Sequence, residues 1–157
     1  MYRLTALVAF LCAVLLGCGP HGRETYPKIS YGRDVCSECR MIISDPQFTA
    51  VFSDASGEIF KFDDIGCMRL YEERNHPEIK TRWVRDYESG QWLEGSKAFF
   101  VFSKSFVTPM GHGIAAFGAR GNALNFLKDR EGRIVSWEEM GKHSKMGTQN
   151  QLTEEIQ

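Results

Sequence analysis

The sequence has no apolar run long enough to cross a membrane and no concentration of basic residues. Its longest apolar stretch, residues 4–16, is shorter than the roughly 20 residues that a membrane-spanning helix needs. The 157 residues carry 19 basic and 20 acidic side chains, for a formal net charge of −1. A near-neutral balance without a basic tract argues against nucleic acid as a partner.

The residue groupings that mark common catalytic sites are also missing. There is no Ser/His/Asp grouping, no paired-carboxylate signature and no glycine-rich phosphate loop. We therefore do not expect an enzyme. A second Cys-x-x-Cys is absent as well, so four-cysteine zinc and iron–sulfur motifs are not met.

The first residues have the features of an export signal. A positive start at Arg3 precedes the apolar stretch, which ends in Leu-Leu-Gly followed by Cys18. This order is similar to a bacterial lipobox, in which the cysteine takes the lipid and becomes the mature N-terminus. We predict a lipoprotein signal peptide over residues 1–17, lipidation at Cys18, and a location in the cell envelope, facing the periplasm or extracytoplasmic space. An ordinary cleaved signal is the alternative.

Composition divides the rest of the chain into three parts. Residues 18–34 contain prolines, glycines and mixed polar residues without apolar periodicity, which predicts a flexible tether. Residues 35–140 are long enough for one compact domain. Residues 141–157 are polar and unpatterned, which predicts a disordered tail.

Periodicity within residues 35–140 predicts an α+β fold. A helix capped by Asp63 or Asp64 should end at His76-Pro77, and a second should follow a cap at Asn122. The continuous apolar run at 98–102 should be covered on both faces at the centre of the fold. Strands are predicted at 48–53 and 59–62 as a hairpin, and at 81–87, 91–94, 98–102, 114–117 and 134–137.

This order of elements suggests two small related units, at about 35–80 and 81–140. Each would contain antiparallel strands with one helix, and the two would pack as a compact domain. Similar turns, Ala-Ser-Gly and Ala-Arg-Gly, precede the two helices. The similarity between the halves is too low to establish an internal duplication.

Three sulfur-containing side chains fall within six residues at Cys36, Cys39 and Met41. Two cysteines at this spacing can form a disulfide, share a metal or exchange electrons. A thioether is a poor zinc ligand, but together with thiolate it suits Cu(I). If the chain is extended, Cys39 and Met41 leave the same face with Cα atoms about 6.7 Å apart. A structural disulfide beside an ordinary methionine is the alternative.

Three further residues are candidates for the same chemistry. Cys67 falls in the first turn of the first predicted helix, where a core cysteine is favoured over a ligand. Met110 and His112 lie in a glycine- and proline-rich stretch, typical of an accessible loop or of a plain turn. We hypothesise that the 109–113 loop folds over the 36–41 loop and that Met110 completes the coordination.

Soft ligands and a lipid anchor fit an extracytoplasmic carrier of Cu(I), which would pass its ion to a partner by ligand exchange. A membrane-tethered thiol–disulfide oxidoreductase using Cys36 and Cys39 is the alternative from another class.

Several motifs in this order resemble the NosL family, over roughly residues 35–140. They are 36–41 (Cys-Ser-Glu-Cys-Arg-Met), 62–68 (Phe-Asp-Asp-Ile-Gly-Cys-Met), 109–111 (Pro-Met-Gly), and the Ala-Phe…Ala-x-x-Phe…Gly pattern of 116–132. The resemblance implies a Cu(I) chaperone for the assembly of nitrous oxide reductase in denitrification, working with a membrane ABC-type complex. It also implies two related α+β units, akin to part of the organomercurial lyases.

The resemblance implies Cys39 and Met41 as ligands first, then Met110, then Cys36. His112 and Cys67 are candidates on chemical grounds rather than from the family pattern. This chain departs from the family pattern at Arg40, where the family usually has glycine. A long cation at that position could narrow access to the site or stabilise a thiolate.

Overall fold

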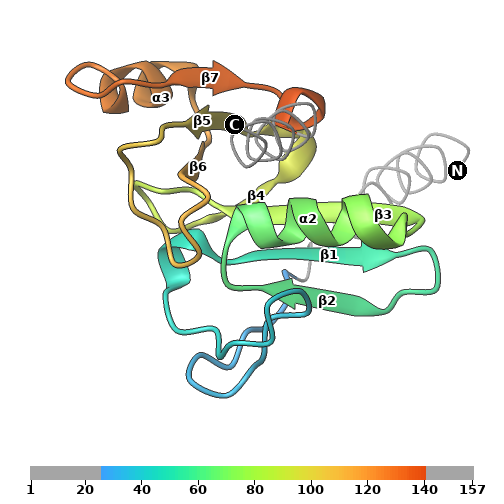
Figure 1. The fold of residues 1–157 in the computed structure, drawn as a ribbon. Helices are drawn as coiled ribbons and strands as arrows, with labels where there is room; N and C mark the ends of the chain where they lie inside the picture. Colours follow the sequence, from blue (N-terminus) through green and yellow to red (C-terminus); the bar gives the residue numbers. More distant parts are fainter. Residues whose placement is uncertain (1–25, 141–157) are drawn as a thin grey trace, which may run out of the picture.

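The computed structural model describes residues 26–140 and has the predicted α+β architecture (Figure 1). A four-stranded antiparallel sheet has the order β2-β1-β3-β4, and a three-stranded antiparallel sheet has the order β6-β5-β7. The elements are η1 (Pro46–Phe48), β1 (Ala50–Asp54), β2 (Ile59–Phe62), α2 (Ile65–Asn75), β3 (Ile79–Arg85), β4 (Trp92–Glu94), η2 (Gly95–Lys97), β5 (Phe99–Phe102), β6 (Ile114–Phe117), α3 (Arg120–Phe126) and β7 (Arg133–Val135).

The predicted first hairpin is present, and β1 is one of the two inner strands of its sheet. Ala50 lies opposite Phe62 of β2 and Val84 of β3. The first four residues of β1 are all buried, so both faces of this part of the strand are covered. The strand starts later than predicted, because Pro46 opens a 3-10 turn that holds Phe48, with the Gln47 N–H donating to the Asp45 carboxylate.

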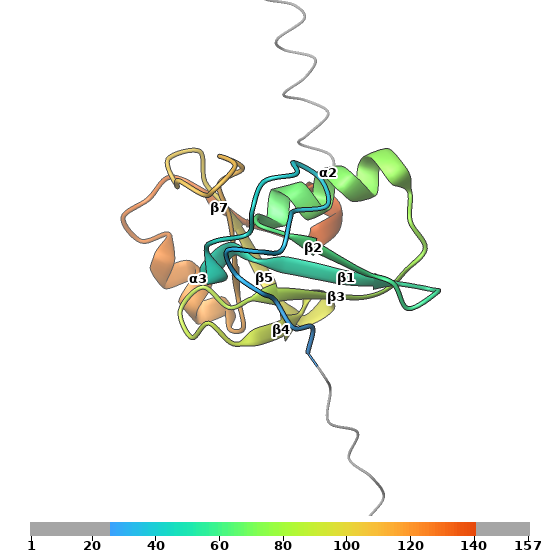
Figure 2. The ribbon, with the colours of Figure 1, turned by 90° about the horizontal axis from the view of Figure 1, so that it is seen from below.

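Helix α2 begins and ends where the sequence predicts. The Asp64 carboxylate accepts the Gly66 N–H at 2.7 Å and so caps one of the unpaired amides of the first turn. His76 ends the helix in the left-handed conformation, with φ 47°, and Pro77 cannot continue it. The helix packs along β1 and β2, which places its first turn at the end of β2 (Figures 1 and 2).

Strand β5 lies at the centre of the second sheet and is covered on both faces, as predicted. Phe100 joins the main core, which also contains residues of β1, β2 and α2. Val101 points to the other face and packs with Phe117 and Phe126 beneath α3. The second sheet is therefore enclosed between the main core and α3.

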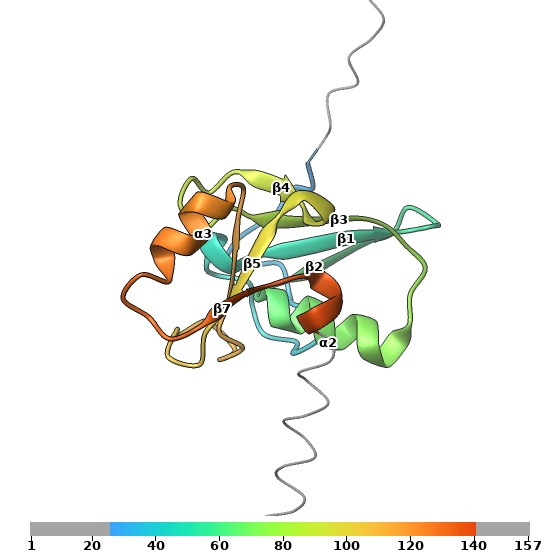
Figure 3. The same ribbon diagram turned by 90° about the horizontal axis from the view of Figure 1, so that it is seen from above.

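Asp86 ties the two sheets together. It forms a parallel bridge with Ala116, and its carboxylate accepts the Gly118 N–H at 2.6 Å. At the other end of the second sheet, Trp137 donates to Glu72 of α2 at 3.1 Å, which holds the last described turn beside that helix (Figure 3). The two sheets therefore form one packed domain.

The structure differs from the sequence predictions at several boundaries. Helix α3 begins at Arg120 with Ala119 at its cap, so Asn122 is not the cap. Strand β7 ends at Val135, before Trp137. The first sheet includes β3 and β4 and so runs past the predicted unit boundary near residue 80.

The N-terminal part of the described chain is packed rather than free. Ile29 and Tyr31 lie against the main core, and the Gly32 N–H donates to the Ile43 carbonyl at 2.9 Å. The end of the predicted 18–34 tether is therefore part of the domain. The predicted signal peptide, the predicted lipidation site Cys18 and the predicted tail lie outside the described residues. No helix between residues 26 and 140 is long and apolar enough to cross a membrane.

Candidate metal centre

Residues 36–41 form a tight loop that projects sulfur atoms toward the start of α2. An antiparallel bridge between Val35 and Ile42 closes the base of the loop. Inside it, the Cys36 N–H donates to the Met41 carbonyl at 2.8 Å. The loop is thus a miniature hairpin, whose geometry fixes the relative directions of the two cysteines.

Contacts on two sides hold this loop in place. The Ser37 N–H donates to the Lys61 carbonyl of β2 at 2.8 Å, and Lys61 forms an ion pair with Asp34 at 2.7 Å. On the other side, Glu38 pairs with Arg74 of α2. The loop is therefore held against both β2 and α2, which supply the remaining members of the site.

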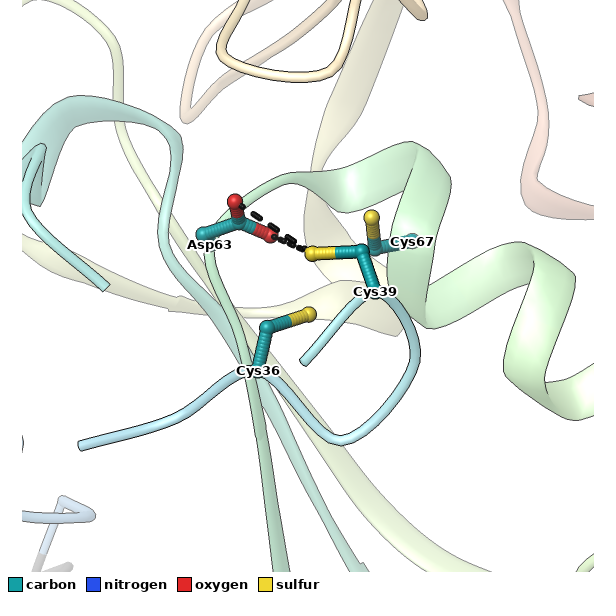
Figure 4. A group of neighbouring side chains, drawn as sticks. All are labelled: Cys36, Cys39, Asp63 and Cys67. Carbon is teal, nitrogen blue, oxygen red and sulfur yellow. Dashed lines mark hydrogen bonds between the residues drawn. The ribbon is translucent and has the colours of Figure 1, made fainter. Parts of the chain in front are cut away.

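Four potential ligand atoms converge between this loop and α2. The sulfurs of Cys36, Cys39 and Cys67 and a carboxylate oxygen of Asp63 all lie within 4.8 Å of one another (Figure 4). Asp63 follows β2, and Cys67 is the third residue of α2. We call these four residues the cysteine cluster.

Access to the cysteine cluster is uneven. Cys36 and Cys67 are 0% and 1% exposed, whereas Cys39 is partly exposed. The Cys39 thiol donates to both oxygens of Asp63, at 3.5 and 3.7 Å. An ion held by the cluster would therefore reach solvent on the side of Cys39.

The thiols of the cluster differ in acidity. A hydrogen bond from the Cys67 thiol, helped by the backbone N–H groups of Asp63 and Cys39, lowers the pKa of Cys36 to about 7 although burial opposes ionisation. Burial, together with the negative charges of Cys36 and Asp63, raises the pKa of Cys39 to about 11. The hydrogen bond to Cys36 and then burial raise the pKa of Cys67.

At neutral pH the cluster therefore holds one readily formed thiolate, at Cys36. Further thiolates require a cation to share the charge, so metal binding would displace protons. Three sulfurs and one carboxylate oxygen suit a soft or borderline ion such as Cu(I) or Zn(II). The three cysteines are free thiols in this structure, and their odd number leaves one unpaired if two oxidise.

The other predicted ligands, Met41, Met110 and His112, are not among the four residues of the cluster. Met41 is 57% exposed at the end of the loop. Met110 is partly buried against the main core, and its backbone N–H donates to Asp64 at 3.2 Å. His112 Nε2 lies 3.9 Å from the Cys67 sulfur. The 109–113 loop thus reaches the first turn of α2, next to the cluster.

The sequence analysis does not predict Asp63 as a ligand and assigns it only a possible role as a helix cap. It gives Cys67 as a candidate ligand but favours a core cysteine. Cys67 is buried as predicted, but its sulfur faces the other two cysteines. The signal that could have found both is their position: a carboxylate and a thiol flank the first turn of a helix that starts directly after a strand.

The model of the NosL family matches residues 29–144, which include the whole cysteine cluster. The chain belongs to the NosL family. A crystal structure of the copper chaperone NosL from Shewanella denitrificans is similar to it, with a TM-score of 0.63 and 17% sequence identity over 72% of this chain and 93% of that one. At this identity the likeness shows a shared NosL fold. No curated protein sequence matches the chain.

Membership of the NosL family accounts for the course of the chain around the site. The matched segment starts at residue 29, where the chain begins to pack on the core. It contains the 36–41 loop, the start of α2 and the 109–113 loop. The family match and the fold therefore agree on the segments that form the candidate metal centre in this NosL-family chain.

Proposed function

We propose that this chain is a Cu(I)-binding metallochaperone and not an enzyme. The observation that carries the proposal is the convergence of the Cys36, Cys39 and Cys67 sulfurs within 4.8 Å of one another, in a chain that belongs to the NosL family. The name of the similar solved protein, a copper chaperone, supports the same assignment.

The distribution of exposure supports a carrier rather than a permanent metal site. Cys36 would hold the ion from the buried side, and Cys39 would bind it on the open side. We assign the surrounding donors Met41, Met110 and His112 to loading and transfer. The exposed thioether of Met41 can meet an incoming ion or a partner's ligand without opening the core.

Sulfur donors favour Cu(I) over harder ions. Thiolate and thioether ligands are soft donors, and they select soft ions such as Cu(I). A Cu(I) ion accepts two or three sulfurs, whereas a structural Zn(II) site closes four positions. The cluster supplies three sulfurs, so Cu(I) is the ion that it can satisfy with sulfur alone.

The cellular role follows from the resemblance and from the first residues. We propose that Cys18 carries a lipid that anchors the domain in the cell envelope, facing the periplasm or extracytoplasmic space. Residues 19–28 would then give the domain reach above the membrane surface. The recipient would be apo-nitrous oxide reductase, loaded with the help of a membrane ABC-type complex.

A thiol–disulfide oxidoreductase is the second candidate, because the pKa of Cys36 is lowered to about 7, as an attacking thiol requires. Two observations weigh against it. Cys36 is fully buried, out of reach of a protein disulfide, and the adjacent Cys67 would compete for any disulfide formed with Cys39.

A competition titration tests the proposal. The purified full chain, kept reduced and free of oxygen, is offered Cu(I) and Zn(II) together. We expect one Cu(I) to load while zinc stays in solution. Preferential zinc loading would refute the copper assignment, and turnover of a protein disulfide by the metal-free chain would support the oxidoreductase.

A further inference from the structure

The three sulfurs of the cysteine cluster form a triangle that one ion can bridge. They lie within 4.8 Å of one another. A point equidistant from three sulfurs at that full separation is about 2.8 Å from each, against about 2.3 Å for a metal–thiolate bond. A contraction of about half an ångström per sulfur therefore closes all three bonds.

The environment of Cys67 is that of a ligand rather than of a space-filling thiol. Its sulfur lies within 4.8 Å of the Cys36 and Cys39 sulfurs and 3.9 Å from His112 Nε2. It sits in the first turn of α2, which begins at Ile65 directly after Asp63 and the capping residue Asp64. An ion bound to Cys36 and Cys39 alone would lie next to the Cys67 sulfur, because the three sulfurs are within 4.8 Å of one another.

We propose that Cys67 is the third sulfur ligand of the carried ion, and that Cys36, Cys39 and Cys67 form a three-sulfur site within the domain. The identity of the ion rests on the proposed function, whereas the site itself rests on the geometry of the cluster. Met41 then lies outside the stored ion's coordination shell and acts during transfer.

Asp63 offers the same site a fourth possible ligand, a carboxylate oxygen rather than a sulfur. It is 4% exposed and faces the Cys39 sulfur with both oxygens. A carboxylate oxygen is a hard donor that Cu(I) does not need but that Zn(II) accepts in a tetrahedral site. We infer that Cu(I) uses the three sulfurs and that Zn(II) uses the three sulfurs with Asp63.

X-ray absorption at the metal edge, combined with an affinity titration, tests the role of Cys67. The wild-type full chain loaded with Cu(I) should show three sulfur neighbours. In Cys67→Ser one sulfur should be lost, and the affinity should fall by more than the roughly 10–100-fold that loss of an outer-shell partner costs. The matched control Met41→Leu should keep three sulfurs.

Three sulfurs and unchanged affinity in Cys67→Ser, with a sulfur lost in Met41→Leu, would overturn the proposal. Circular dichroism of the metal-free variants, and Cys67→Ala as a second substitution, show whether the fold is retained. A wild-type chain that rejects Cu(I) but binds Zn(II) through three sulfurs would refute the proposed function and leave the three-sulfur site standing.

Asp63→Asn tests whether Asp63 is a ligand of Zn(II). The asparagine amide keeps an oxygen that can accept a hydrogen bond from the Cys39 thiol, but it lacks the negative charge of the carboxylate. Zn(II) affinity should fall by about tenfold or more, as expected when a charged donor is lost, while Cu(I) affinity stays within about twofold. Equal losses for both ions, or none for either, would overturn the assignment of Asp63.

Discussion

Gly66 and Gly121 offer a matched pair for testing the position of His112. Each is the second residue of its helix, in α2 and α3 respectively. In an open helix, replacing glycine by alanine gains up to about 1 kcal/mol, because alanine has the better helix propensity. The surroundings of the two glycines differ, so the same substitution should have opposite effects.

A Cβ atom at Gly66 would lie 2.1 Å from Cγ and 2.4 Å from Cβ of His112. These atoms are close to the backbone, so the ring cannot simply rotate away and the 109–113 loop must move. Overpacking of this kind costs about 1–3 kcal/mol. Against the gain in propensity, Gly66→Ala should lower the free energy of unfolding by about 1–2 kcal/mol.

A Cβ atom at Gly121 meets nothing within 4 Å. Gly121→Ala should therefore raise the free energy of unfolding by about 0.5–1 kcal/mol. Urea unfolding of the reduced, metal-free chain measures both variants on one scale. Equal stabilisation by the two substitutions would refute the placement of His112 against the first turn of α2, and with it the approach of the 109–113 loop to the cysteine cluster.

Further predictions concern the turn, the link between the sheets and the anchor. Arg40 has φ 67°, so Arg40→Gly should stabilise the domain by about 0.5–1 kcal/mol in thermal unfolding; an equal gain in Arg40→Ala would implicate charge instead. Burial would raise the pKa of Asp86, but amides of Ser89 and Gly118 outweigh it and hold the pKa below 3.8. Asp86→Asn should therefore cost about 1–3 kcal/mol at pH 7, and the difference should disappear as the pH falls below 3.8; a pH-independent cost would contradict this. Cys18→Ser should move the protein to the soluble fraction, and its retention in membranes would contradict lipidation.

Local patterns sufficed for much of the fold. The hairpin of β1 and β2, the Asp64 cap and the end of α2 at His76 all depend on residues close in sequence. The predicted start of α3 is wrong because the residue that caps it, Ala119, makes no side-chain hydrogen bond to the helix. The sequence pattern instead favours Asn122, whose polar side chain is typical of a helix cap. In β1, burial of both faces comes from the neighbouring strands and the packed elements, which alternation within the strand does not reveal.

The site was predictable only where its members are neighbours in the chain. Cys36 and Cys39 stand out by their spacing, whereas Asp63 and Cys67 reach them only after the hairpin folds and docks the 36–41 loop beside α2. The direction of the Cys67 side chain depends on that docking. The left-handed backbone at Arg40, with φ 67°, is a conformation that suits glycine better than arginine.

Native mass spectrometry of the full chain, incubated with Cu(I) under reducing conditions without oxygen, tests the central claim most directly. We predict one copper ion retained per wild-type chain and none in the Cys36→Ser/Cys39→Ser double variant, with both proteins folded by circular dichroism. Failure of the wild-type chain to retain copper, or equal retention by the folded double variant, would contradict a Cu(I) carrier built on the cysteine cluster.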